Sequence, residues 1–195
     1  LHNNRHSFPT RRSSDLLLIR PAPLPYHRQR WETPDGDFID LDWYPALPAE
    51  KEADCATPLL VLFHGLEGSS ASHYATTVLR AAAALGWNGV AVNFRGCSGE
   101  ANRLPRAYHS GDSAEIDWIL RRLHLQVPAR RRYAVGVSLG GNTLLKWLGE
   151  QGAAAGECLH AAAAISAPLD LAACRHQLAR GFNRIYTRHF LKTLK

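Results

Sequence analysis

A segment of seven residues at positions 135–141, Val-Gly-Val-Ser-Leu-Gly-Gly, constrains the fold of this chain more than any other stretch. Residues 132–135 before it have the composition of a short buried strand, and leucines after it recur at helical spacing. A G-x-S-x-G turn between a strand and a helix holds its serine in a strained backbone conformation. A Cβ at Gly136 or Gly140 would collide with the neighbouring strand or helix. The pattern therefore predicts that Ser138 presents its hydroxyl at a sheet edge beside a helix N-terminus, although a plain glycine-rich turn is the alternative.

Apolar runs alternate with helical patterns through the rest of the chain. Leu59–Phe63, Gly89–Asn93 and Leu159–Ile165 are continuously apolar, as expected of strands that are covered on both faces. Helical spacing follows the first two runs, and Asp112 with Glu115 three residues later predicts a capping box at one helix start. Alternating strands and helices predict right-handed crossovers and a mostly parallel sheet.

A β-hairpin is predicted before the first parallel strand, because Asp35-Gly36 is a strong turn signal between residues 27–33 and 38–44. Apolar residues at 39, 41 and 43 alternate with Asp40 and Asp42. This alternation predicts one packed face and one wet face, at the edge of the sheet.

Composition divides the chain into four segments. Residues 1–16 have no periodicity and resemble a translated sequencing adapter from His6 to Leu16, so we exclude them as non-native or disordered. They hold three arginines and one aspartate, whose removal lowers the net charge from +6 to +4. A linker and the hairpin occupy 17–57, the α/β core 58–168, and the start of a helical lid 169–195.

Several classes of function find little support in the composition. The four cysteines form no C-x-x-C pair, so free thiols in a reducing cytosol are expected, with a cytoplasmic location. No apolar run approaches the roughly 18 residues of a membrane span. Arg130-Arg131-Arg132 lacks interleaved aromatic residues, so we interpret it as a solvated helix end and expect no nucleic-acid partner. No metal site and no cofactor are expected, since no ligand spacing or phosphate-binding motif occurs.

An activated serine needs donors for the oxyanion that develops on its substrate. The backbone N–H of Leu139, directly after Ser138, is one candidate. The second is the N–H of Leu66, because Gly65 allows a close backbone approach in the loop after Leu59–Phe63. A plain strand-to-loop turn is the alternative for this loop. Both loops are expected at the edge of the parallel sheet where ligands bind.

An ordered set of motifs resembles the YheT-like branch of the α/β-hydrolase superfamily from about Arg28 to Lys195. The set consists of HGLEGSS at 64–70, NFRGCSGE at 93–100, YHSG at 108–111, GVSLGGN at 136–142 and GFNRIY at 181–186. The resemblance implies an α/β-hydrolase fold, with an antiparallel N-terminal hairpin and helices on both faces of the sheet. It also implies a serine esterase or lipase-like hydrolase with Ser138 as nucleophile and Leu66 and Leu139 as oxyanion-hole donors.

The chain departs from the family pattern after the serine. In α/β hydrolases the acid and the histidine follow in the order Ser…Asp…His, on loops after later strands. We expect those strands and both residues beyond Lys195, so that this chain is a fragment with little activity alone. Six other acids and histidines are present, and we expect none of them to act as the base or its partner: Asp112, Asp170, His109, His160, His176 and His189.

Two hypotheses for function remain. The first is a serine hydrolase that acts on small-molecule or lipid-like carboxylic esters through a Ser-Asp-His mechanism. The second is an α/β-hydrolase fold retained as a non-catalytic binding module.

Overall fold

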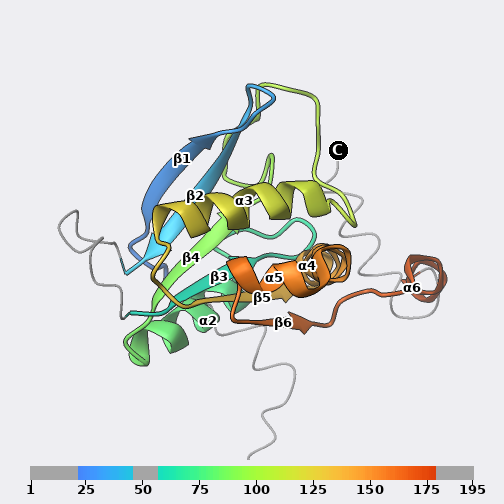
Figure 1. Cartoon of the computed structure of the whole chain (residues 1–195). Coiled ribbons are helices and arrows are strands. Elements are labelled where there is room, and N and C mark those ends of the chain that lie inside the picture. The colour runs from blue at the N-terminus through green and yellow to red at the C-terminus, as the bar shows by residue number, and fades with distance from the viewer. Residues whose placement is uncertain (1–21, 46–56, 179–195) are drawn as a thin grey trace, which may run out of the picture.

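The computed structural model describes residues 22–45 and 57–178, which form a single sheet flanked by helices (Figure 1). The strands are β1 (His27–Glu32), β2 (Phe38–Tyr44), β3 (Leu59–Phe63), β4 (Asn88–Asn93), β5 (Arg132–Val137) and β6 (Ala161–Ile165). The helices are α2 (His73–Ala84), α3 (Ser113–Gln126), α4 (Leu139–Gln151), α5 (Ala155–Cys158) and α6 (Leu171–Leu178), with a short 3-10 turn at Gly152–Ala154. The adapter-like segment 1–16 and Cys55 lie outside the described residues, as does most of 169–195 beyond α6.

The sheet order is β1-β2-β4-β3-β5-β6. β3, β4, β5 and β6 run parallel, whereas β1 and β2 form an antiparallel hairpin that joins the sheet through an antiparallel β2–β4 pairing. The predicted mostly parallel sheet with an N-terminal antiparallel hairpin is therefore confirmed. Because all four parallel strands point the same way, the loops that follow them meet at one edge of the sheet.

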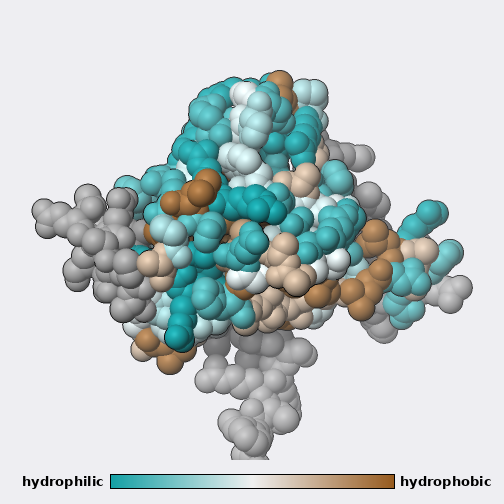
Figure 2. All heavy atoms as spheres, in the orientation of Figure 1, coloured by the Kyte–Doolittle hydropathy of each residue, from teal (hydrophilic) through white to brown (hydrophobic). Residues whose placement is uncertain are grey.

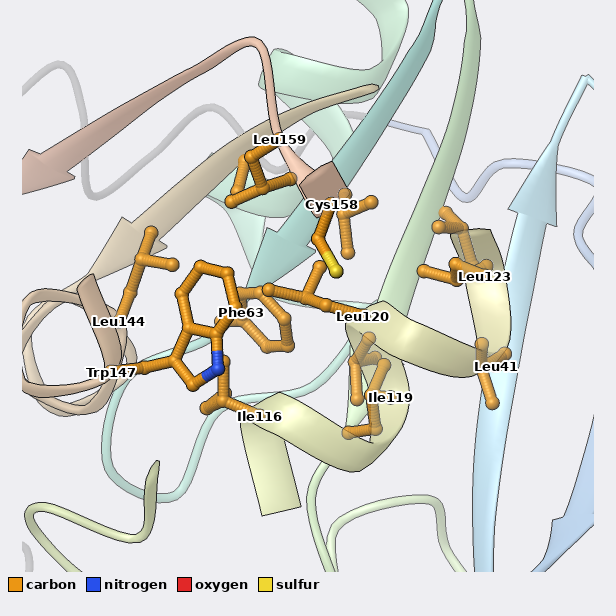
Figure 3. Packing of buried hydrophobic residues seen from close by; sticks show 14 of the residues in the cluster. Leu41, Phe63, Ile116, Ile119, Leu120, Leu123, Leu144, Trp147, Cys158 and Leu159 are labelled. Carbon is orange, nitrogen blue, oxygen red and sulfur yellow. The ribbon is translucent and has the colours of Figure 1, made fainter. Parts of the chain in front are cut away.

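Helices cover both faces of the sheet, as the continuous apolar strands predict. Successive side chains of a strand point to opposite faces. Val61 and Phe63 of β3 pack in the larger cluster against α3, α4 and α5, where Ile116, Leu144 and Trp147 fill the space over the sheet (Figure 3). Leu62, between the two, packs on the other face in a smaller cluster with residues of α2.

The predicted wet face of β2 is wrong. Asp40 and Asp42 are both about 1% exposed. In the β1–β2 register Arg30 lies opposite Asp40 and Arg28 opposite Asp42, and each guanidinium forms a bidentate pair with its aspartate at 2.7–2.8 Å. The side chains of Arg28 and Arg30 are 42% and 35% exposed and cover the two carboxylates, so the alternation belongs to buried aspartates beneath a solvent-facing layer of arginines.

The predicted capping box at the start of α3 is also wrong. Asp112 is the N-cap residue, but its side chain makes no capping hydrogen bond. Glu115 is buried and accepts a hydrogen bond from Arg95 Nε at 2.7 Å. Burial acts to raise the pKa of Glu115 and outweighs the lowering effect of Arg95. The Glu115 side chain, which the local pattern assigned to the start of the helix, instead forms an ion pair with a residue 20 positions away.

The last strand differs from the prediction in its burial. Leu159 is buried, but the strand begins at Ala161, and all five residues of β6 are exposed. In Figure 2 pale brown, moderately apolar atoms lie where Figure 1 draws β6. β6 is the last strand in the sheet order, and the part of the chain described here pairs it only with β5. Apolar composition predicted burial, but burial depends on what packs against the strand.

The arginine run before β5 is not solvated as predicted. Arg130 and Arg132 are both 2% exposed, whereas Arg131 is exposed. The Arg132 guanidinium donates to the backbone carbonyls of Cys158 and Val127, each at 2.7 Å. These carbonyls belong to the ends of α5 and α3, where helical C=O groups lack partners within the helix. Arg132 therefore joins two helix C-termini to the start of β5.

Candidate active site

The turn between β5 and α4 has the geometry that the sequence predicts. Ser138 has φ 52° and ψ −116° and is the N-cap residue of α4. Its backbone N–H donates to Ile165 O at 2.8 Å, which ties the turn to the end of β6. A non-glycine residue at such a positive φ costs on the order of 1–3 kcal/mol and persists where its surroundings enforce it.

Glycines make this turn possible by allowing close backbone contacts. A Cβ on Gly136 would lie 2.5 Å from Gly140 O, and a Cβ on Gly140 would lie 2.4 Å from Phe63 O. Real Cβ atoms do not approach backbone so closely. The predicted requirement for glycine at both positions is confirmed. The backbone of α4 packs directly against Gly136, and the backbone at the end of β3 packs directly against Gly140.

The loop after β3 lies directly against the serine. A Cβ on Gly65 would be 3.1 Å from Ser138 Cβ and 3.7 Å from Ser138 Oγ. Leu66 follows Gly65 and is 38% exposed, whereas Leu139 is 8% exposed and begins α4. The structure thus brings Ser138, Leu139 and the loop that carries Leu66 together at one edge of the sheet.

The backbone N–H groups of this loop are almost all occupied. Between Gly65 and Ser70, within the described chain, each N–H except that of Leu66 donates to a protein acceptor. The acceptors are Tyr74 Oη for Gly65, Tyr108 Oη for Glu67, Gly65 O for Gly68, Ser72 Oγ for Ser69 and Asn93 Oδ1 for Ser70. The pattern leaves the Leu66 N–H available to a ligand.

Backbone strain gathers at the same edge. The described non-glycine residues with positive φ are Glu67, Ser138 and Ser166, at 55°, 52° and 52°. They follow β3, β5 and β6, respectively. Such residues cluster where function depends on a fixed backbone, and here they surround the serine turn.

His64 is buried at the start of this loop, a histidine beside the serine turn that the sequence pattern did not identify. Its Nε2 accepts the Phe94 N–H at 3.0 Å, and its Nδ1 lies 2.7 Å from Gly65 O. These partners fit a neutral ring that carries its proton on Nδ1. Burial lowers the pKa of His64 to about 4. With both nitrogens engaged by backbone, His64 fixes the start of the loop and cannot serve as the base for Ser138.

The lowered pKa of His64 predicts a pH-dependent stability. Between pH 6.5 and about 4, the unfolded chain binds a proton at this residue and the folded chain does not. The free energy of unfolding should therefore fall by about 3 kcal/mol as pH drops through this window. Urea unfolding of wild type and His64→Gln at pH 7 and pH 4 measures the effect. The variant should lose about 3 kcal/mol less than wild type, and the exposed His109→Gln should behave like wild type; parallel losses in all three proteins would contradict the assignment.

The acids and histidines that we do not expect to act as the base have other surroundings wherever the structure describes them. Asp170 Oδ1 accepts the Ala173 N–H at 2.9 Å and so caps α6. His109 is exposed, with its Nε2 3.7 Å from Asp112 Oδ2. His160 precedes β6 at the opposite edge of the sheet and accepts the Arg132 N–H. The described part of α6 exposes His176, and His189 lies outside the described residues. Among the described side chains, no histidine or carboxylate is hydrogen-bonded to Ser138 Oγ.

A pocket of about 210 Å³ lies between the β1–β2 turn and the start of α3, but Ser138 does not line it. Its charged lining includes Arg95 and Glu115, which pair with each other, and Arg106, which pairs with Asp112. Within residues 22–45 and 57–178, no three His, Cys, Asp or Glu side chains are grouped to share a metal ion. None of the helices in these ranges is long and apolar enough to span a bilayer.

Comparison with known proteins gives relatives over most of the chain. YheT of Escherichia coli (strain K12), a protein whose name proposes an esterase activity, is 46% identical over 179 residues, which cover 92% of this chain and 51% of YheT. Phospholipase ABHD3 of Mus musculus is 31% identical over 187 residues, which cover 93% of this chain and 45% of that protein. The chain therefore spans about half the length of the curated relatives that it matches.

The comparison with solved structures and the match to a family model indicate the same fold. The crystal structure of the α/β hydrolase GrgF from Penicillium sp. sh18 superposes with a TM-score of 0.56 at 16% identity, over 75% of this chain and 47% of that one. This likeness supports the fold alone. A family model described as alpha/beta hydrolase fold matches residues 58–188, which contain the serine turn and the loop of Leu66. The chain belongs to the α/β-hydrolase family and is YheT-like within it.

Proposed function

We propose that the whole protein, meaning the complete gene product that contains this chain, is a serine hydrolase of carboxylic esters with Ser138 as its nucleophile. One observation carries the proposal: a strained serine lies against a loop in which Leu66 has the only uncommitted N–H between Gly65 and Ser70 of the described chain. The Leu139 N–H, at the first position of α4, is the second proposed donor. Two such N–H groups can stabilise the negative charge that forms on a carbonyl oxygen.

In the proposed reaction, Ser138 Oγ attacks the ester carbonyl and its proton passes to a histidine base. The carbonyl oxygen becomes an oxyanion between the N–H groups of Leu66 and Leu139. Collapse of this intermediate releases the alcohol and leaves an acyl group on Ser138, which water then removes. We propose that the histidine and the aspartate that orients it come from sequence beyond Lys195. On this proposal the 195-residue chain alone hydrolyses esters at a rate near background.

The names of two relatives and the chemistry of the proposed site support one substrate class. An esterase is proposed in the name of one relative, and another is named a phospholipase. We therefore propose a small-molecule or lipid-like ester as substrate and a cytoplasmic location. No nucleic-acid partner is proposed, and the burial of Arg130 and Arg132 leaves Arg131 as the one exposed side chain of that run.

A non-catalytic binding module remains the second candidate, because no described histidine or carboxylate contacts Ser138 Oγ. A fluorophosphonate probe separates the two functions, since it reacts with an activated serine. We expect the native whole protein to be labelled and mass spectrometry to map the adduct to Ser138. Heat-denatured protein and the 195-residue chain should be labelled weakly. Labelling of the native protein that is no stronger than in the denatured control would favour the binding module.

A further inference from the structure

Two tyrosine hydroxyls hold the loop of Leu66 from either side. Tyr74, on the first turn of α2, accepts the Gly65 N–H at 2.9 Å. Tyr108, on the long loop between β4 and α3, accepts the Glu67 N–H at 2.7 Å. The two donors flank Leu66 in the sequence, and the acceptors come from segments separated by more than 30 residues. The loop is thus fixed at two points by side chains that lie outside it.

The tyrosines are themselves held in place. The Tyr108 ring stacks on Phe94 with centroids 5.3 Å apart and planes at 8°, and it meets the His64 ring edge-on at 6.1 Å. Phe94 and His64 are both buried. A Cβ on Gly68 would lie 2.4 Å from Tyr74 Oη, so the absence of a side chain at Gly68 leaves room for the Tyr74 hydroxyl.

The two hydrogen bonds restrict the peptide groups on both sides of Leu66. Glu67 has φ 55°, and the bond from its N–H to Tyr108 acts on the residue that is strained. Without these acceptors, the N–H groups of Gly65 and Glu67 could compete with that of Leu66 for an anionic ligand, and the strained backbone could relax. Misplacing a donor of this kind by about 1 Å can reduce a rate by about 100-fold.

We infer that Tyr74 and Tyr108 are positioning residues for the oxyanion hole, which hold the flanking N–H groups so that, within this loop, the Leu66 N–H alone faces the substrate. This inference rests on the proposed function for the role of Leu66. The contacts of the tyrosines with the loop do not depend on it, so the two can be tested separately.

Hydrogen exchange tests the contacts in the 195-residue chain itself. Tyr108→Phe and Tyr74→Phe keep the rings and remove only the hydroxyls. The Glu67 amide should exchange at least about tenfold faster in the first variant, and the Gly65 amide in the second. Tyr26→Phe is the matched control, because the Tyr26 hydroxyl donates to Ser70 O at 2.7 Å in the same loop without touching either amide. Unchanged exchange at Glu67 and Gly65 would overturn the inference.

Kinetics of the whole protein test the consequence for catalysis. Each Tyr→Phe change should lower kcat for p-nitrophenyl acetate by about 10- to 100-fold, with KM within about twofold of wild type. The loss should be smaller on the corresponding thionoester, whose sulfur accepts hydrogen bonds weakly. Tyr26→Phe should leave kcat unchanged. Equal losses on both substrates would contradict a positioning role, because they would show that the tyrosines act only on the structure. A wild-type protein that is inactive on both substrates would instead refute the proposed function. The hydrogen-exchange result would then still test the contacts of the tyrosines with the loop.

Discussion

Replacing Ser138 by alanine is expected to lower kcat/KM of the whole protein for p-nitrophenyl acetate by about 10⁴- to 10⁶-fold. The variant removes only the hydroxyl oxygen of Ser138, whose φ is 52°, and should leave the backbone of the turn unchanged. The oxyanion donors remain, so the residual rate should exceed the rate in buffer by up to about 10³- to 10⁴-fold. Initial rates at substrate concentrations well below KM measure this effect.

Ser166 offers a matched control for Ser138→Ala. It is an exposed serine with the same φ of 52°, and it follows Ile165, whose carbonyl accepts the Ser138 N–H. Ser166→Ala therefore removes a hydroxyl at the same sheet edge and from a residue with the same φ. We expect its kcat/KM to stay within about threefold of wild type. A comparable loss in both variants, or retention of activity in Ser138→Ala, would remove Ser138 from the role of nucleophile.

Replacing Arg95 by methionine is expected to lower the free energy of unfolding by about 3–5 kcal/mol. The Arg95 side chain is 2% exposed; its guanidinium lies 3.1 Å from Asp37 Oδ2 and 2.7 Å from Glu115 Oε1. Asp37 and Glu115 are themselves 0% and 3% exposed at their side chains. Methionine fills a similar volume but removes the guanidinium closest to both buried carboxylates and leaves Glu115 only the more distant Arg106, at 4.0 Å. Urea unfolding of the 195-residue chain at pH 7 measures the loss.

An exposed arginine that also pairs with a carboxylate is the control for Arg95→Met. Arg121 pairs with Asp117 one helical turn away on the surface of α3, at 2.9 Å. Arg121→Met should cost less than about 1 kcal/mol, because water replaces the lost partner. Adding Glu115→Gln to Arg95→Met should recover part of the loss, because it removes one of the two buried charges that Arg95 had neutralised. Equal destabilisation by Arg95→Met and Arg121→Met would show that the buried network contributes no more than a surface pair.

Local patterns predicted what local geometry controls. The hairpin, the strands, the serine turn and the need for Gly136 and Gly140 follow from turn chemistry, periodicity and steric exclusion over a few residues. The same patterns failed for Asp40, Asp42 and Glu115, because side chains from other elements neutralise these carboxylates. A signal for the first two was present: Arg28 and Arg30 alternate along β1 with the same period. To predict the ion pairs from this alternation, one must also know the register between β1 and β2, which the alternation alone does not give.

The sequence by itself determined that a serine lies in a strained turn between a strand and a helix, because that turn is encoded within seven consecutive residues. Only the tertiary structure decided which N–H groups beside it remain free. Tyr74 and Tyr108 reach the loop from α2 and from the segment after β4, and the sheet order that brings them there depends on contacts between residues far apart in the chain. Periodicity reports which face of an element is apolar, whereas a hydrogen bond between distant segments exists only after those faces have packed.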